Sequence, residues 1–119
     1  MDELRERVNP IRVTDNETGE VYTLDFNRDA IITMERDEFD VDDVVKYPKT
    51  NFPKFFYYAT RMYHKRLSRG QTDKLYEAIG GMTEEFLQRL HLLYNQAVMA
   101  GTFQDKEDLE KNTRVTVEF

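Results

Sequence analysis

The spacing of the hydrophobic residues changes abruptly at Phe26, and this change limits the folds that the chain can adopt. Before it, Ile11 and Val13 alternate with polar residues, and a second apolar run begins at Val21. Alternation on both sides of the turn-forming stretch 15–20 predicts a β-hairpin with an irregular loop. After Phe26 the apolar residues follow helical spacing. A hairpin that runs directly into helices predicts an α+β fold that is mostly helical.

Two short helical segments are expected between Phe26 and Pro48. Asn27 is the expected N-cap of the first, and the Asp29 carboxylate lies near the positive end of its dipole. Asp40 is the expected N-cap of the second, which must end before Pro48 because the residue before a proline disfavours the helical conformation. The residues expected to face the core are Phe26, Ala30, Ile31, Met34, Val41, Val44 and Val45.

Three longer helical segments follow. The first of these runs from Asn51 to Leu67, the next ends at Gly80, and the last runs from its N-cap Thr83 to Gly101. The expected core-facing residues are Phe52, Phe55, Phe56, Ala59, Met62, Tyr63 and Leu67, then Leu75, Ala78 and Ile79, then Phe86, Leu90, Leu93, Tyr94, Ala97 and Val98.

The 119-residue length fits one domain. We expect an N-terminal tail over 1–9, a helical domain with its hairpin over 10–102, and a charged C-terminal segment over 103–119. Within the last segment, residues 113–119 alternate between apolar and polar side chains. They predict a C-terminal strand that adds to the hairpin edge or pairs with another copy, or else a tail that becomes a strand on binding.

Several kinds of chemistry find no support in the sequence. The chain has no cysteine, which excludes disulfides, thiolate catalysis and cysteine-ligated zinc. None of the common nucleotide-binding or hydrolase motifs occurs, and the two histidines, His64 and His91, lie on different expected helices. We therefore expect a protein that is not an enzyme and has no cofactor and no metal. The N-terminus has no signal-peptide pattern, and no apolar run is long enough for a membrane span, so we expect a soluble cytoplasmic protein.

Six acidic residues crowd into the stretch 35–43 and raise the question of a cation site. An EF-hand loop needs glycine at its sixth position and glutamate at its twelfth. Loops counted from Glu38 or from Asp40 have neither residue in place. This favours a solvated acidic junction between helices over a cation site.

The stretch 54–69 has the composition of a single-strand nucleic-acid surface, because it contains both aromatic residues and lysines and arginines, with no acidic residue among them. In that interpretation Arg61, Lys65, Arg66 and Arg69 would contact phosphates. The net charge of −6 argues against nucleic-acid affinity. A nucleic-acid-binding regulatory protein is therefore the alternative function, and pairing of this helix with the acidic junction is the structural explanation.

Four apolar or aromatic residues are left over once the core faces are assigned. Tyr57 and Tyr58 point away from the Phe52/Phe56 arc, and Leu92 and Met99 are seven residues apart on one side of the last helix. Such residues form either a protein-binding surface or a face buried within the bundle. We take them as the candidate surface for a client protein or for a second copy of the chain.

The stretch GEVYTLDFNRDAIITMERDEFD resembles the opening of the tail assembly chaperones of long-tailed bacteriophages and prophages. In that family a short strand of the Tyr-x-Leu-x-Phe type runs directly into a helix that carries alanine and then glutamate. The corresponding residues here are Tyr22, Leu24, Phe26, Ala30 and Glu35. The resemblance covers roughly residues 11–100, and this chain has RDEFD where many family members have a glycine soon after the glutamate.

The resemblance implies a chaperone without enzymatic activity in the cytoplasm of the bacterial host. Its client would be the tape measure protein, a long helical chain that sets tail length and is prone to aggregate. Tail tube protein would later replace the chaperone and is the second implied partner. The family also implies a longer product made by ribosomal frameshifting.

Overall fold

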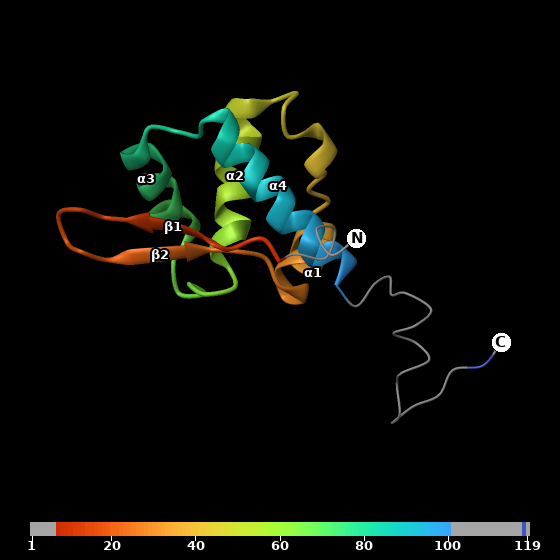
Figure 1. The fold of residues 1–119 in the computed structure, drawn as a ribbon. Helices are drawn as coiled ribbons and strands as arrows, with labels where there is room; N and C mark the ends of the chain where they lie inside the picture. Colours follow the sequence, from red (N-terminus) through yellow and green to blue (C-terminus); the bar gives the residue numbers. More distant parts are fainter. Residues whose placement is uncertain (1–6, 101–117, 119) are drawn as a thin grey trace.

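The computed structural model describes residues 7–100 and 118, and it begins with the antiparallel hairpin that the sequence predicts (Figure 1). Strand β1 (Ile11–Thr14) pairs with β2 (Val21–Leu24), so that the first residue of β1 lies opposite the last residue of β2. The loop is closed by the Asp15 N–H, which donates to the Glu20 carbonyl at 2.8 Å. Gly19 adopts φ +79° in this loop, a conformation that glycine accepts without steric cost.

Four α-helices and one short 3₁₀ helix follow the hairpin. They are α1 (Arg28–Arg36), η2 (Val41–Asp43), α2 (Pro48–Thr60), α3 (Arg69–Ile79) and α4 (Glu84–Met99). The α+β, mostly helical prediction is confirmed. None of the helices in the described part of the chain is long and apolar enough to cross a membrane.

The predicted N-caps Asn27, Asp40 and Thr83 form the bonds expected of them, whereas Asn51, also predicted as a cap, lies inside α2. Asn27 accepts a hydrogen bond from the Ala30 N–H at 2.9 Å, and Thr83 accepts one from the Phe86 N–H at 3.1 Å. Each cap satisfies one of the N–H groups that a helix start leaves without a partner. Helix α3 carries a cap that was not predicted, because Ser68 and Gln71 form a reciprocal capping box.

The core lies where the hairpin, α1, α2 and α4 meet, with α2 at its centre (Figure 1). Phe55 and Phe56 are fully buried on α2. The Phe26 ring, from the strand–helix junction, lies 5.5 Å from the Phe55 ring and 5.9 Å from the Tyr94 ring. The buried apolar residues are Val13, Leu24, Phe26, Ala30, Ile31, Met34, Val41, Val44, Phe55, Phe56, Tyr58, Ala59, Leu90 and Leu93.

Asp25 connects the hairpin to the core at the point where the residue spacing changes. Its backbone N–H donates to the Ala59 carbonyl at 3.0 Å, and its Oδ1 accepts the Phe26 N–H at 2.8 Å. The side chain is almost completely buried. These bonds fix the end of β2 against α2 and set the direction in which α1 begins.

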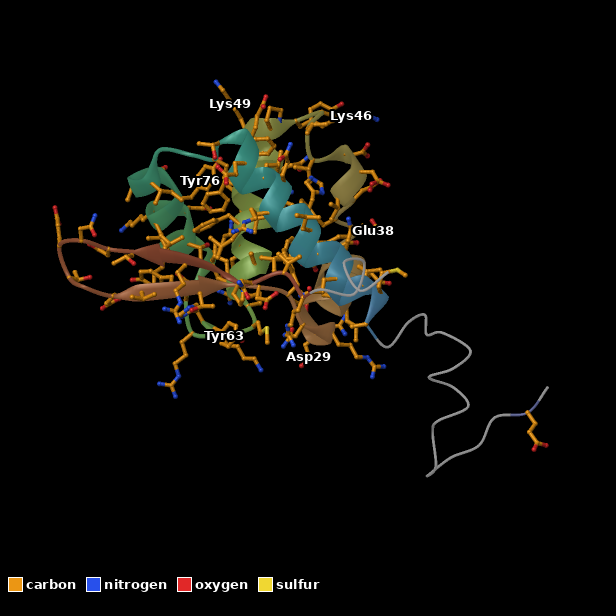
Figure 2. All side chains as sticks on the ribbon, viewed as in Figure 1. Asp29, Glu38, Lys46, Lys49, Tyr63 and Tyr76 are labelled. Carbon is orange, nitrogen blue, oxygen red and sulfur yellow. The ribbon has the colours of Figure 1, made fainter. Side chains whose placement is uncertain are left out.

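The predicted boundaries of α2 are wrong at both ends. The helix begins at Pro48, which suits a first turn because that N–H needs no partner. It ends at Thr60, because the chain turns back and the Arg61 guanidinium donates to the Leu67 carbonyl at 2.6 Å. Tyr63 therefore projects outward from a loop, as Figure 2 shows, and does not face the core.

Three other residues predicted to face the core are exposed. Val45 lies beyond the 3₁₀ turn, where the chain no longer follows helical spacing. Ala78 is exposed because it lies about 160° around α3 from Tyr76, which packs on Phe56. Ile79 is the last residue of α3 and is 37% exposed.

The chain termini lie largely outside the described residues. The predicted tail 1–9 is described only from residue 7, and the Val8 N–H donates to Gln96 Oε1 at 2.6 Å. The C-terminal segment 103–119, with its predicted strand, is described only at Glu118. The prediction of a C-terminal strand therefore lies outside the described residues and stays a prediction.

Candidate functional site

Leu92 and Met99 lie on the outward face of α4. Their exposed fractions are 50% and 52%, whereas Leu90 and Leu93 on the same helix are fully buried. This difference between neighbouring leucines fixes the rotation of α4 about its axis. The two residues are therefore accessible to a partner, as the binding interpretation requires.

Tyr58 is not part of this surface, because it follows the other alternative and is buried within the bundle. Its exposed fraction is 6%. The phenol donates to Asp37 Oδ2 at 2.7 Å, and the ring packs on Phe39 with 5.1 Å between centroids. Burial and the hydrogen bond to Asp37 raise the pKa of Tyr58 above its usual value. The segment that follows α1 folds over Tyr58 and buries it. Helical spacing within α2 cannot predict this burial, because the segment lies outside α2.

Tyr57 is half-buried and contributes to a different part of the molecule. The Arg61 guanidinium lies 4.2 Å from the centre of its ring, and that of Arg69 lies 5.6 Å from it. Two cations over one aromatic ring hold the end of α2 against the start of α3. Tyr57 thus contacts the α2–α3 side, and the four predicted residues do not form one surface.

Four exposed residues follow one line along α4, and we call them the α4 outer stripe: Gln88, Leu92, Asn95 and Met99. Their spacing of four, three and four residues is the spacing of a coiled-coil seam. Leucine and methionine occupy one of the two alternating seam positions, and amides occupy the other. A stripe of this kind can pack against another helix, with less apolar area than a fully hydrophobic seam provides.

A hollow lies between α1 and α4, beside Ile32, which is 39% exposed. Tyr94 and Val98 line it from α4. Both are predicted to face the core, and they pack against it while remaining partly exposed. At 100° per residue, Val98 lies about 100° from Met99, so the hollow opens on a different flank of α4 from the outer stripe.

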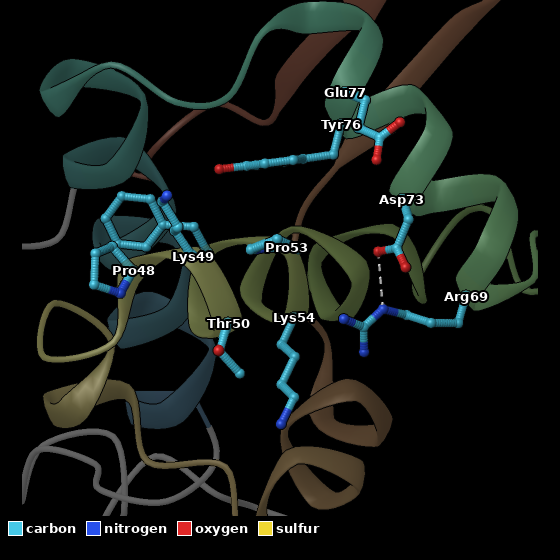
Figure 3. A pocket seen from close by; sticks show the side chains of 10 residues that line it. Pro48, Lys49, Thr50, Pro53, Lys54, Arg69, Asp73, Tyr76 and Glu77 are labelled. Carbon is cyan, nitrogen blue, oxygen red and sulfur yellow. Dashed lines mark hydrogen bonds and ion pairs between the residues drawn. The ribbon is translucent and has the colours of Figure 1, made fainter.

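A second hollow, of about 540 Å³, lies between the beginning of α2 and α3 (Figure 3). Phe52, Pro53 and Tyr76 give it apolar walls. Lys49, Lys54 and Arg69 stand at its rim together with Asp73 and Glu77, and Arg69 Nε lies 3.0 Å from Asp73 Oδ1. Sequence reasoning missed this hollow because two separate elements, α2 and α3, form its walls. Rim charges of both signs give it no preference for an anion or a cation.

The basic residues of the nucleic-acid interpretation are partly occupied within the protein. Arg61 donates to the carbonyls of Leu67 and Lys65, so its guanidinium holds the loop after α2. Arg69 forms the ion pair with Asp73. Lys65 and Arg66 remain exposed. Two of the four residues assigned to phosphate contacts thus have structural partners.

The histidines are used in packing and hydrogen bonding. His64 Nε2 accepts the Thr23 N–H at 2.9 Å, and the His91 ring packs against Phe55 with 5.2 Å between centroids. Burial lowers the pKa of His91 below its ordinary value of 6.5, and the nearby Asp42 opposes this shift. Across residues 7–100 and 118, no three histidine, aspartate or glutamate side chains are grouped closely enough to hold a metal ion.

Comparison with known proteins identifies the family of the chain. The family described as Domain of unknown function (DUF5055) matches residues 5–119. Searches of curated proteins and of solved structures gave no match. Because the family match covers almost the whole sequence, the chain belongs to the DUF5055 family.

Proposed function

We propose that this chain is a tail assembly chaperone of long-tailed bacteriophages and prophages, and that it acts in the bacterial host cytoplasm. Its client is the tape measure protein, and the α4 outer stripe contacts an apolar face of that helical client. The observation that supports this proposal is the exposure of Leu92 and Met99 at seam spacing on a well-capped helix. The resemblance of the strand–helix junction to this chaperone family supports it independently.

The stripe suits a contact that must later be broken. Burying a leucine or methionine side chain contributes about 1.5–3 kcal/mol, whereas association costs at least about 4 kcal/mol in lost freedom. Two such residues give only a weak contact, and the amides of Gln88 and Asn95 add little apolar area. Methionine adapts to different partner surfaces because its side chain is flexible. Tail tube protein could then displace the chaperone without having to break a tight complex.

The net charge of −6 also fits this role. A chaperone that covers apolar helix faces leaves its own polar surface facing the solvent. Mutual repulsion between such complexes keeps them apart and in solution. This effect requires no catalytic group.

The experiment is co-expression with the tape measure protein encoded near this chain's gene. We expect a tail tube gene before this gene and a gene for a very long helical protein after it. The native chain should increase the soluble fraction of the long protein. If the genomic neighbourhood holds no such gene, or if the long protein stays insoluble with the native chain, the proposal fails.

The variant Leu92→Lys/Met99→Lys tests the stripe itself. Lysine keeps high helix propensity at both positions, and at position 99, in the last turn of α4, its charge interacts favourably with the helix dipole, so the fold should persist. The matched control is Val45→Lys/Ile79→Lys, which makes the same charge change at two other exposed apolar positions. The stripe variant should lose client solubilisation, and the control should retain it. Equal activity of both variants would refute the role of the stripe.

A further inference from the structure

The α2–α3 hollow has two walls of opposite charge. Figure 3 shows Lys49 and Lys54 on the α2 side of the hollow, and Asp73 and Glu77 on the α3 side. Arg69 pairs with Asp73 at 3.0 Å, which leaves the Glu77 carboxylate to set the charge of the α3 side. A positive wall and a negative wall therefore stand beside each other on one face of the molecule.

Each of these charges reinforces the partial charge of the helix end that carries it. Lys49 is the second residue of α2, and the first turn of that helix has no acidic residue and no side-chain cap. Glu77 lies in the last turn of α3, and that turn has no basic residue. A helix start is partly positive and a helix end is partly negative, so both placements are unfavourable within one copy. An opposite charge from outside the molecule would offset them.

An exposed aromatic side chain stands next to the hollow. Tyr47 directly precedes Pro48, which lines the hollow, and its exposed fraction is 67%. Its side chain forms no cap hydrogen bond with α2. The apolar walls formed by Phe52, Pro53 and Tyr76 suit an aromatic ring, and the charged rim can bind the polar tip of a phenol. The chain thus carries both a hollow and a side chain that can fill the same hollow in another copy.

We propose that two copies of the chain associate through this face, with the start of α2 of each copy inserted into the α2–α3 hollow of the other. A two-fold axis brings the same surface of both copies together, so each contact forms twice. Lys49 of one copy then meets Glu77 of the other, and the Tyr47 ring enters the hollow. A second copy carries both charges in the matching arrangement, whereas a ligand of one sign would be repelled by one wall. The inference is independent of the proposed chaperone function, since it uses neither the α4 outer stripe nor a client.

Charge reversal tests the proposal, with sedimentation velocity as the measurement. The native chain should show a monomer–dimer equilibrium. Lys49→Glu and Glu77→Lys should each weaken dimerisation at least about tenfold, because each turns two attractive contacts into repulsive ones. Neither should unfold the chain, since each new charge has the sign that the helix dipole favours. The matched controls Lys65→Glu and Glu17→Lys make the same charge changes at exposed positions that do not line the hollow, and they should dimerise like the native chain.

Combined variants show whether these two residues meet across a two-fold axis. A mixture of Lys49→Glu chains and Glu77→Lys chains should form heterodimers, because each reversed charge then faces an opposite charge. One chain with both changes should dimerise like the native chain for the same reason. A native chain that stays monomeric at every concentration would overturn the proposal, and so would a mixture that forms no heterodimers.

The aromatic contact is tested at Tyr47. Tyr47→Ala should weaken dimerisation at least about tenfold, whereas Tyr47→Phe should retain most of it, because the ring fills the hollow. Unchanged dimerisation of Tyr47→Ala would contradict the insertion. A dimer that is lost in Leu92→Lys/Met99→Lys and kept in Lys49→Glu would mean that the α4 outer stripes pair, which would also overturn the proposal.

Discussion

Replacing Leu93 by alanine should destabilise the protein far more than replacing its neighbour Leu92. The two side chains are chemically identical and adjacent in the same helix, so helix propensity changes equally in both variants. They differ in burial, since Leu93 is fully buried and Leu92 is 50% exposed. The comparison therefore tests which face of α4 meets the core, on which the α4 outer stripe depends.

The expected magnitudes follow from this burial. A fully buried leucine changed to alanine loses its transfer free energy and leaves a cavity, which together cost about 2–5 kcal/mol. An exposed leucine changed to alanine should cost within about 0.5 kcal/mol. With a urea m-value of about 1.5 kcal/mol/M, a loss of about 3 kcal/mol lowers the unfolding midpoint by about 2 M. The Leu92→Ala midpoint should move by no more than about 0.3 M.

The assay is urea unfolding followed by circular dichroism at 222 nm, at a protein concentration where all variants are monomeric. Monomeric conditions matter because an associating stripe would add its own concentration-dependent stability. Equal midpoint shifts for Leu92→Ala and Leu93→Ala would refute the assigned rotation of α4. A larger shift for Leu92→Ala would place the stripe inside the bundle and would remove the proposed binding surface.

Three further predictions concern single side chains. Tyr58→Phe removes the hydrogen bond to Asp37 and should lower the free energy of unfolding by about 1 kcal/mol in urea titrations. Ser68→Ala removes the Ser68 Oγ acceptor of the Gln71 N–H in the capping box. It should lower the free energy of unfolding by about 1 kcal/mol, with thermal melting as the measurement. Burial lowers the pKa of His91 in the folded state, so the unfolded state binds the proton first as the pH falls through 6.5, and stability should decrease below that pH. His91→Gln should weaken this decrease in urea titrations between pH 7.5 and pH 5.5, and an unchanged pH dependence would contradict the assignment.

The hairpin and the helix starts could be predicted because their causes are local. Residue alternation, loop composition and the capping residues Asn27 and Thr83 all act within a few positions of one another. The ends of α2 could not be predicted in this way. They depend on the Arg61 guanidinium, which binds a carbonyl six residues along the chain, and on a proline that serves as a first residue.

The candidate surface was predicted in part, and the difference has a physical cause. The period of the helix fixes the angle between Leu92 and Leu93, so the outward face of α4 follows from the sequence alone. The burial of Tyr58 depends on the segment after α1, which reaches it from outside α2. The periodicity of a helix gives no information on contacts that its residues make with a segment outside the helix. The α2–α3 hollow was missed for a similar reason, because two separate elements form its walls.

The loss of Tyr57 and Tyr58 from the proposed binding surface changes how the chaperone would have to work. One stripe on one helix buries too little apolar area for a single copy to hold a long client on its own. In the proposed role, however, a long helical client would present similar apolar faces many times along its length. Several weakly bound copies would then cover it, and each would leave separately as tail tube protein arrives. The proposed function therefore requires many copies per client, and the measured stoichiometry should rise with the length of the client segment.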